Sequence, residues 1–289
     1  MSRTIKRLVP WFGANTATAA EVGRQMGDPD WACVLFAGGC AELPHIRCRG
    51  GVANDLHRHV INLARVISDP KAKVRLAERL AEVLFHPDEL AEAQARCQLI
   101  ENDIVANSNL FDERGQRVFK LPMVEWAFDY FITAWMARGG NAGTEGEFKG
   151  GLPIRYDANG GGSNVRYRSA VAALDAWHAE CKRWEWTCKD CFDVLRRIGD
   201  AKRKAVYADA PWVGAGENYR HKFTEKDHRN LAAQLEEYRE ARVVVRYGDH
   251  PLIRELYREP HWTLREQTSR DQANGGVSEL LIVNGPMFK

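Results

Sequence analysis

The sequence predicts an α/β fold, a Rossmann-like three-layer sheet that is interrupted by a helical insertion. Short apolar runs typical of buried parallel strands occur in the first quarter and the last third of the chain. Residues 69–183, between them, have the periodicity of helices instead. The first strand runs into a glycine turn, as nucleotide-binding folds do. We therefore expect a sheet domain built from residues 1–68 and 184–289, with the insertion as a second domain.

The first expected elements form a strand–turn–strand–helix unit. Ala32 to Phe36 has the pattern of a buried strand and runs into Ala37, Gly38 and Gly39. Gly51 to Asn54 has the pattern of a second strand, and Asp55 follows it. Glycines let a ligand approach the backbone, and an acid about 20 residues later can bind ribose hydroxyls. The helix expected next has one apolar face, made of Leu56, Val60, Leu63, Ala64 and Ile67.

The insertion is expected to be helical with one long polar segment. Helical periodicity is clear at Val74 to Leu84 and at Val124 to Trp135. The aromatic residues of the second stretch favour core packing over a platform for stacking bases. Arg138 to Arg168 is rich in Gly, Asn and Arg and is expected to be a long loop.

Strand patterns resume after the insertion. A short strand is expected at Trp184 to Thr187, and stronger ones at Ala205 to Asp209, Arg242 to Arg246 and Glu279 to Val283. A helix is expected at Glu225 to Glu240. Thr224 would be its N-cap, and Leu231 and Leu235 would face inward.

The tetrapeptide Asp209-Ala210-Pro211-Trp212 is the most informative motif, because it follows a buried strand directly. Sites in open α/β sheets form at the carboxyl ends of strands. Asp209 and the Ala210 carbonyl could accept hydrogen bonds from an exocyclic amine, Pro211 would fix the turn, and Trp212 offers a stacking face. The motif thus suits a flat ring that carries an amine. An ordinary proline turn after a strand is the alternative.

Two sets of possible metal ligands are weaker signals. His178, Cys181, Cys188 and Cys191 could hold zinc, but their spacing is short for a structural site, so buried free cysteines are favoured and no metal is predicted. His57 and His59 are too close for a helical ligand pair and are expected on the surface.

Composition sets broad limits. The chain has 289 residues, 45% of them hydrophobic, which suits one large domain with an insertion or two domains. Its net charge of +2 permits a nucleic-acid partner without arguing for one. No apolar run approaches the ~20 residues of a membrane span, and the first ten residues do not have the pattern of a secretory signal. Seven scattered cysteines are typical of reduced thiols, so we expect a cytoplasmic protein.

Four segments, in a fixed order, carry a resemblance to a known family. They are Trp11-Phe12-Gly13-Ala14-Asn15, then Phe36-Ala37-Gly38-Gly39 with Asn54-Asp55, then Asp209-Ala210-Pro211-Trp212, and last Ser278 to Asn284. In this the chain resembles the Dam-type DNA adenine N6-methyltransferases, whose catalytic motif is Asp-Pro-Pro-Tyr. The run Phe223 to Leu235 is similar to the helix after that motif.

The resemblance implies a methyltransferase sheet with S-adenosylmethionine as cofactor. It implies that Asp55 binds the ribose and that Trp11 and Gly13 line the methionine end. The full set of implied cofactor-binding residues is Trp11, Phe12, Gly13, Asn15, Phe36, Ala37, Gly38, Gly39, Asn54 and Asp55. The implied catalytic residues are Asp209, Ala210, Pro211 and Trp212.

The resemblance also implies that the insertion reads the DNA sequence. Arg and Asn are the side chains that read guanine and adenine edges. The loop after the catalytic tetrapeptide would close over the base or grip phosphates, with a solvated basic loop as the alternative. The candidate DNA-binding residues are Tyr219, Arg220, Lys149, Arg155, Arg166 and Arg168.

The chain departs from the family pattern at several positions. Asn15 stands where the family has a lysine, Val34 and Leu35 stand where it has an acidic residue and a proline, and Cys40 replaces a small residue. Ala210 replaces a proline, but it still supplies the backbone carbonyl that the reaction needs.

From these observations we expect a site-specific enzyme that moves a methyl group from S-adenosylmethionine to N6 of a flipped-out adenine in double-stranded DNA. N4-cytosine methylation and a catalytically impaired DNA-binding relative are the alternatives. No membrane association is expected, and the protein is expected to be a monomer or a weak dimer.

Overall fold

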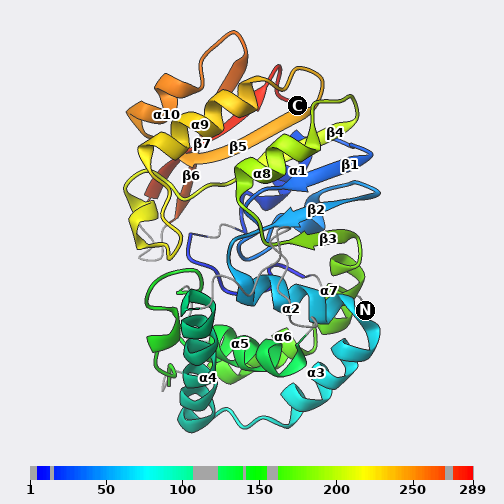
Figure 1. Cartoon of the computed structure of the whole chain (residues 1–289), viewed down its shortest axis with the longest axis vertical. Helices are drawn as coiled ribbons and strands as arrows, with labels where there is room; N and C mark the ends of the chain where they lie inside the picture. The colour runs from blue at the N-terminus through cyan, green and yellow to red at the C-terminus, as the bar shows by residue number, and fades with distance from the viewer. Residues whose placement is uncertain are drawn as a thin grey trace. The chain divides into compact units, whose positions relative to one another are not determined.

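The computed structural model describes residues 5–13, 16–106, 123–138, 141–154, 162–270 and 276–288. The chain divides into two compact units. We call Met1–Phe12 with His57–Lys182 the helical unit, and Gly13–Leu56 with Arg183–Lys289 the sheet unit. Figure 1 follows the chain through both by colour.

The sheet unit contains a seven-stranded sheet in the order β3-β2-β1-β4-β5-β7-β6. Neighbouring strands from β3 to β5 run parallel, whereas β7 runs antiparallel to both β5 and β6. This confirms the predicted α/β class with a Rossmann-like, mostly parallel sheet. The strands are β1 (Trp31–Val34), β2 (Gly50–Asn54), β3 (Trp184–Thr187), β4 (Lys204–Ala208), β5 (Arg242–Gly248), β6 (Trp262–Arg270) and β7 (Gly276–Asn284).

The strand order reverses direction between β1 and β4. From β1 the chain continues to β2 and β3 on one side, while β4 and β5 lie on the other. Val34 near the end of β1 lies opposite Ala53 of β2 and Tyr207 of β4. The carboxyl ends of these three parallel strands therefore lie side by side. Open α/β sheets bind ligands at such a reversal.

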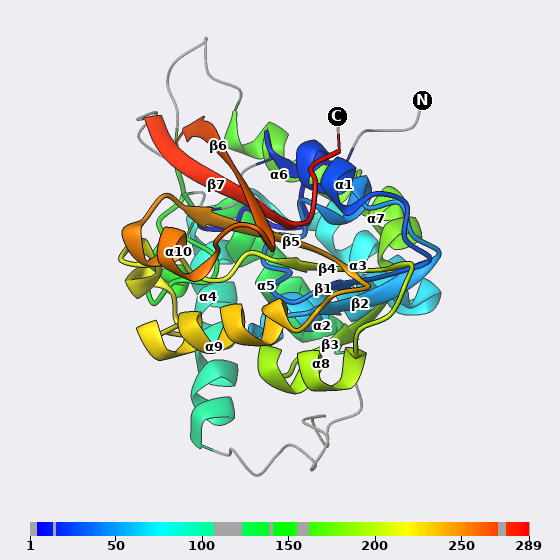
Figure 2. The ribbon, with the colours of Figure 1, turned by 90° about the horizontal axis from the view of Figure 1, so that it is seen from above.

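Helices cover both faces of this sheet. Figure 2 shows α8 (Cys191–Ile198) and α9 (Glu225–Glu236) on one side of the strands and α1 (Ala19–Met26) on the other. One core is formed between the first face, α8, α9 and α10 (Pro251–Leu256). Its fully buried members include Cys33, Leu35, Val206, Ala208, Leu231, Leu235, Val243, Val245, Tyr247, Ile253, Leu280 and Ile282.

The predicted start of α9 is confirmed. The Thr224 hydroxyl accepts a hydrogen bond from the Asp227 backbone N–H, and the Asp227 carboxylate accepts one from the Thr224 N–H. This reciprocal cap satisfies two N–H groups that the first helical turn leaves without partners. Leu231 and Leu235 are fully buried, as expected.

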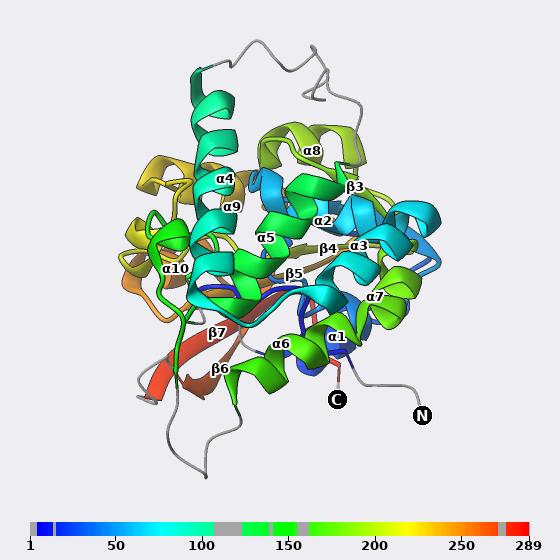
Figure 3. The ribbon, with the colours of Figure 1, turned by 90° about the horizontal axis from the view of Figure 1, so that it is seen from below.

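In the part of the helical unit that the structure describes, the helices run from α2 to α7 (Figure 3). Aromatic side chains of α5 lie in the core of this unit. Trp126, Phe128, Tyr130 and Phe131 of α5 are buried, which confirms core packing for the aromatic stretch. The bounds are α2 (Arg58–Ser68), α3 (Pro70–Glu82), α4 (Pro87–Ala106), α5 (Val124–Met136), α6 (Ser163–Val171) and α7 (Leu174–Cys181). Of the helices in the described ranges, none is long and apolar enough to cross a membrane.

Three expectations about local structure were wrong, and one strand was missed. Leu56 is 40% exposed and precedes α2, so it does not belong to the apolar helix face. His57 and His59 are buried rather than on the surface. The polar strand β6 was not predicted. Arg166 and Arg168 lie on α6 rather than in a loop.

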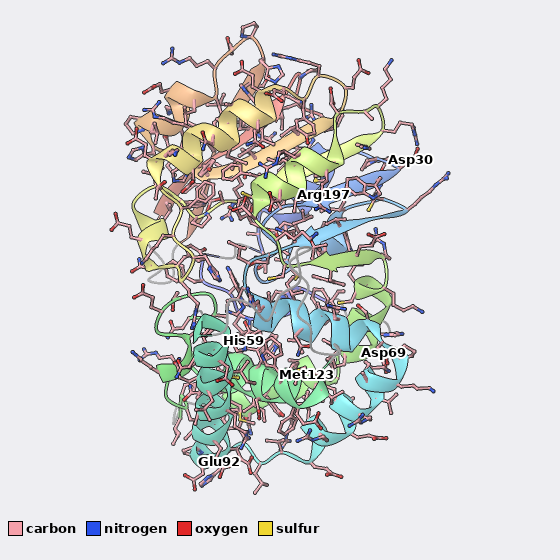
Figure 4. The ribbon with its side chains drawn as sticks, viewed as in Figure 1. Asp30, His59, Asp69, Glu92, Met123 and Arg197 are labelled. Atoms are coloured by element: carbon pink, nitrogen blue, oxygen red, sulfur yellow. The ribbon has the colours of Figure 1, made fainter. Side chains whose placement is uncertain are left out.

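The two histidines are buried because polar partners are buried with them. His57 Nε2 lies 2.8 Å from a Glu147 carboxylate oxygen. His59, labelled on α2 in Figure 4, accepts a hydrogen bond from the Trp126 indole N–H at 2.6 Å. Paired in this way, an imidazole can be buried without the cost of an unsatisfied polar group. The sequence around each histidine gives no sign of partners so far along the chain.

Candidate functional site

Three loops meet at the carboxyl ends of β1, β2 and β4. Residues 35–40 follow β1, Asp55 follows β2, and Asp209–Trp212 follows β4. Because β1 lies between the other two strands, the glycine turn has Asp55 on one side and the tetrapeptide on the other. The structure thus brings together two motifs that are more than 150 residues apart in the sequence.

The turn after β1 is held mainly by backbone hydrogen bonds. The Gly38 N–H donates to Asp55 Oδ2 at 2.7 Å, and the Ala37 N–H donates to the Asn54 carbonyl at 2.8 Å. Gly38 has a φ of +45° and Cys40 one of +59°, which reverses the chain sharply. The family pattern has a small residue where Cys40 stands, yet the turn forms with the larger side chain buried.

Asn54 fixes the ends of β1 and β2 to the segment after β3. Its side-chain N–H group donates to the carbonyls of Leu35 at 3.1 Å and Lys189 at 2.9 Å. Its side-chain oxygen accepts from the Thr187 hydroxyl at 2.8 Å and the Lys189 N–H at 3.0 Å. Asn54 itself is buried, its bond to Leu35 is buried as well, and the three bonds to Thr187 and Lys189 are partly buried. Asn54 therefore acts as a structural support for the turn.

The Asp209 carboxylate lies in a network of buried donors. Its Oδ2 accepts from Arg246 Nη1 at 2.8 Å and from the Tyr207 hydroxyl at 3.4 Å, and its Oδ1 accepts from the Trp212 indole N–H at 3.2 Å. Its side chain is 19% exposed. Burial raises the pKa of Asp209, and the Arg246 charge opposes that rise. A carboxylate has about four acceptor positions, so Oδ1 retains one for a further donor.

Arg246 and Glu279 complete this network, and sequence reasoning missed both. Arg246 makes two hydrogen bonds to the Glu279 carboxylate, from Nε at 3.0 Å and from Nη2 at 2.8 Å. The two side chains are only 3% and 4% exposed. The available signal was a charged residue inside an otherwise apolar strand: Arg246 follows three valines, and Glu279 precedes four apolar residues.

Glu42 adds a third carboxyl group to this region. It is buried, it hydrogen-bonds with the Tyr207 hydroxyl, and burial together with the Asp209 charge raises its pKa to about 7. Near neutral pH it is therefore partly protonated, whereas an exposed glutamate would be ionised.

Trp212 is held on more than one side. Its ring is so close to Gly248 that a Cβ on that glycine would lie 2.7 Å from ring atom Cε3. The Arg246 guanidinium lies 5.0 Å from the centre of the ring, a cation–π distance. Together with the hydrogen bond to Asp209, these contacts fix the indole before any ligand binds.

Comparison with known families decides what this site belongs to. The D12 class N6 adenine-specific DNA methyltransferase family matches residues 30–270, which is most of the chain. The chain belongs to this family. Among curated proteins, no relative matches it. The protein is thus a DNA N6-adenine methyltransferase, a transferase that acts on DNA.

The matched residues of this methyltransferase include the turn after β1, Asp55 and the Asp209–Trp212 tetrapeptide. Val34 and Leu35, which depart from the pattern, are buried in the sheet unit, and the Leu35 N–H donates to the Tyr207 carbonyl at 3.0 Å. Their departure from the pattern therefore leaves the strand pairing intact.

Two further predicted residues of the methyltransferase meet in the sheet unit. A Cβ on Gly13, whose φ is +71°, would lie 2.8 Å from the Tyr219 hydroxyl. Tyr219 follows η4 (Ala215–Asn218), and both Tyr219 and Arg220 are half-buried. Gly13 of the first motif thus lies close to the loop after the Asp209–Trp212 tetrapeptide.

The remaining candidate residues of the methyltransferase lie in the helical unit. Phe12 donates its N–H to the Ala142 carbonyl at 3.1 Å, and the Trp11 ring packs edge-on to His57 with 5.0 Å between ring centres. Lys149, at the end of η3 (Glu147–Lys149), is exposed, as is Arg168 on α6, whereas Arg166 is half-buried. Asn15 and Arg155 lie outside the described residues.

No group of three or more metal-ligating side chains is found in the part of the methyltransferase that the structure describes. The seven cysteines are all free thiols.

Proposed function

We propose that this methyltransferase transfers a methyl group from S-adenosylmethionine to N6 of an adenine that is flipped out of duplex DNA. The supporting observation is the position of the Asp209–Trp212 tetrapeptide beside the glycine turn, at the point where the strand order reverses. A cofactor bound at the turn and a base bound at the tetrapeptide would then be neighbours.

The residues after β1 and β2 fit the adenosine part of the cofactor. Asp55 is half-buried at the end of its strand, where a carboxylate can accept hydrogen bonds from ribose hydroxyls. Gly38 and Gly39 bring backbone close to a ligand, and the half-buried Phe36 adds an apolar wall. When bound, S-adenosylmethionine supplies an activated methyl group.

The residues after β4 fit the amine of the base. An aromatic amine is a poor nucleophile, because its lone pair is delocalised into the ring. Hydrogen bonds from its two protons to Asp209 and to the Ala210 carbonyl would favour a pyramidal nitrogen as positive charge develops there. The ionised Asp209 carboxylate would stabilise that charge.

The base must be flipped out because its N6 lies inside the stacked duplex, where the enzyme cannot reach it. Extruding a base costs on the order of a few kcal/mol, and stacking on an aromatic ring offsets part of that cost. Trp212 is already fixed by Gly248, Arg246 and Asp209, so it can offer this surface without losing side-chain freedom.

The helical unit is proposed to recognise the target sequence. Lys149 and Arg168 are exposed and can contact phosphates or base edges, and Arg155 and Arg166 belong to the same proposal. Tyr219 and Arg220 would contact the DNA near the flipped base.

Identification of the product tests this function. Duplex DNA is incubated with the protein and methyl-labelled S-adenosylmethionine, and the digested nucleosides are separated. We expect the label in N6-methyladenine. Label in N4-methylcytosine would assign the other base amine, and DNA binding without any label would identify an impaired relative.

A further inference from the structure

Arg246 is the centre of a network of charged side chains that links neighbouring strands. One end of its guanidinium holds Asp209 and the other holds Glu279. Arg246 is on β5, Glu279 on β7 and Asp209 directly after β4, so three strands contribute. A guanidinium group held in a fixed position orients the carboxylates that it binds, and its positive charge favours their ionised form.

The network contains more acidic groups than basic ones. One arginine faces Asp209 and Glu279 directly, and Glu42 interacts with both Asp209 and Arg246. Burying such a set without the cation would favour protonated carboxyl groups. A protonated Asp209 could still donate a hydrogen bond, but it would be a weaker acceptor for an amine.

We propose that Arg246, itself oriented by Glu279, is a positioning residue that keeps the Asp209 carboxylate ionised and aims its Oδ1 at the amine of the target base. This inference rests on the proposed function, because it assumes that Asp209 accepts a hydrogen bond from that amine. Arg246 acts only through Asp209 and Trp212.

The contacts of the two Asp209 oxygens support the proposal that Oδ2 binds Arg246 while Oδ1 faces the base. Arg246 donates to Oδ2 at 2.8 Å and Tyr207 donates to the same oxygen at 3.4 Å, whereas among the described residues Oδ1 accepts the neutral indole N–H of Trp212 at 3.2 Å. The charge-assisted hydrogen bond from Arg246 therefore uses Oδ2 and leaves Oδ1 for the amine of the base. The same guanidinium lies against the Trp212 ring, so it sets the acceptor and the stacking surface together.

The titration of Asp209 depends on groups from several elements. They are Arg246 and Tyr247 on β5, Glu279 on β7, Tyr207 on β4 and Glu42 in the segment after β1. Among them the Arg246 charge lowers the pKa of Asp209 and the Glu279 charge raises it. Removing one or the other must therefore shift the acid side of the activity profile in opposite directions.

The experiment measures kcat against pH at saturating DNA and S-adenosylmethionine for wild type, Arg246→Met, Arg246→Lys and Glu279→Gln. In Arg246→Met we expect kcat to fall on the order of 10- to 100-fold and the acid limb to move about one unit or more to higher pH. Arg246→Lys keeps the charge without the fork, so its acid limb should move less.

Glu279→Gln is expected to move the acid limb in the direction opposite to that of Arg246→Met. The glutamine is isosteric and neutral, so the Glu279 charge that raises the pKa of Asp209 is removed, and the acid limb should move to lower pH. A purely structural role would lower activity in both variants without opposite shifts. Opposite shifts support the proposal. Limbs that stay in place, or that move in the same direction, overturn it.

Arg242 provides a matched control on the same strand. Its side chain is half-buried, and it donates to the backbone carbonyls of Gln25 and Asn284 at the other end of β5. Arg242→Lys should leave the pH profile unchanged. If thermal melting shows that Arg246→Met does not fold, Arg246→Lys and Glu279→Gln replace it, and the proposal is again judged by whether their acid limbs move in opposite directions.

Asp209 variants separate this inference from the proposed function. Methyl transfer retained in Asp209→Ala would remove the proposed function, and the inference with it. An inactive Asp209→Ala combined with a wild-type profile for Arg246→Met would remove only the role of Arg246.

Discussion

The turn after β1 and the tetrapeptide after β4 lie at neighbouring strand ends, yet they are held in different ways. The turn depends on backbone N–H groups and carbonyls, joined by two side chains from the end of the next strand, Asn54 and Asp55. The tetrapeptide depends on charged side chains, Arg246 and Glu279, from strands much later in the chain. The turn is held through its own backbone atoms, whereas the tetrapeptide is held through a network of buried charged side chains.

This difference explains which sequence changes each loop accepts. The turn makes its hydrogen bonds through its own backbone atoms, so they do not depend on the side chains within the turn, and they form although Val34, Leu35 and Cys40 depart from the family pattern. The ion network does not tolerate changes of its side chains, because the loss of any partner leaves a buried charge uncompensated. We therefore expect variants of the two loops to fail for different reasons.

The largest effect on stability is expected from Asn54→Ala, which breaks the backbone-built loop. The change removes this partner from the buried Leu35 carbonyl and from the partly buried carbonyl and N–H of Lys189. We expect the free energy of unfolding to fall by about 3 kcal/mol. Chemical denaturation measures it. Thr187→Val, which removes only the hydroxyl bond to Asn54, is the control and should cost less.

Asp55→Ala should separate ligand binding from folding in the same loop. It removes the bond to the Gly38 N–H and the proposed ribose contact. We expect the Kd for S-adenosylmethionine to rise about 10- to 100-fold, which corresponds to roughly 1.4–2.8 kcal/mol. Titration calorimetry measures this. Unchanged affinity would show that the cofactor binds elsewhere.

Gly248→Ala tests the tetrapeptide side without touching a charge. The added Cβ would overlap the Trp212 ring, which must then move away from Arg246 and Asp209. We expect kcat to fall about tenfold, or roughly 1.4 kcal/mol in transition-state stabilisation, with cofactor affinity kept. Full activity in this variant would mean that the position of Trp212 is not important.

The smallest effect is expected from an exposed charge outside both loops. Arg168→Ala should weaken DNA binding a few-fold and reduce the slope of log K against log salt by about 1, if Arg168 contacts a phosphate. Glu145→Gln, at an exposed residue of the same unit, is the comparison and should not reduce that slope. Equal slopes for wild type and Arg168→Ala would place Arg168 away from the DNA.

Local patterns predicted most of the fold. Six of the seven strands follow from apolar runs, and the start of α9 follows from Thr224 and Asp227. The strand β6 was missed because it is largely polar and is held by pairing with β7 along its whole length. Such pairing depends on a partner strand and leaves little trace in periodicity.

The candidate site was predictable to the same extent. Phe36–Gly39, Asp55 and Asp209 were found, since glycines and acids directly after buried strands are local signals. Arg246 and Glu279 were not, because a buried arginine is meaningful only together with partners 37 and 33 residues away. His57 and His59 were placed wrongly for the same reason.

Single-turnover methyl transfer by Asp209→Ala, at saturating duplex DNA and S-adenosylmethionine, tests the central claim most directly. The account predicts that transfer is abolished while cofactor affinity, measured by calorimetry, stays close to that of wild type. Transfer at a rate near that of wild type would contradict it.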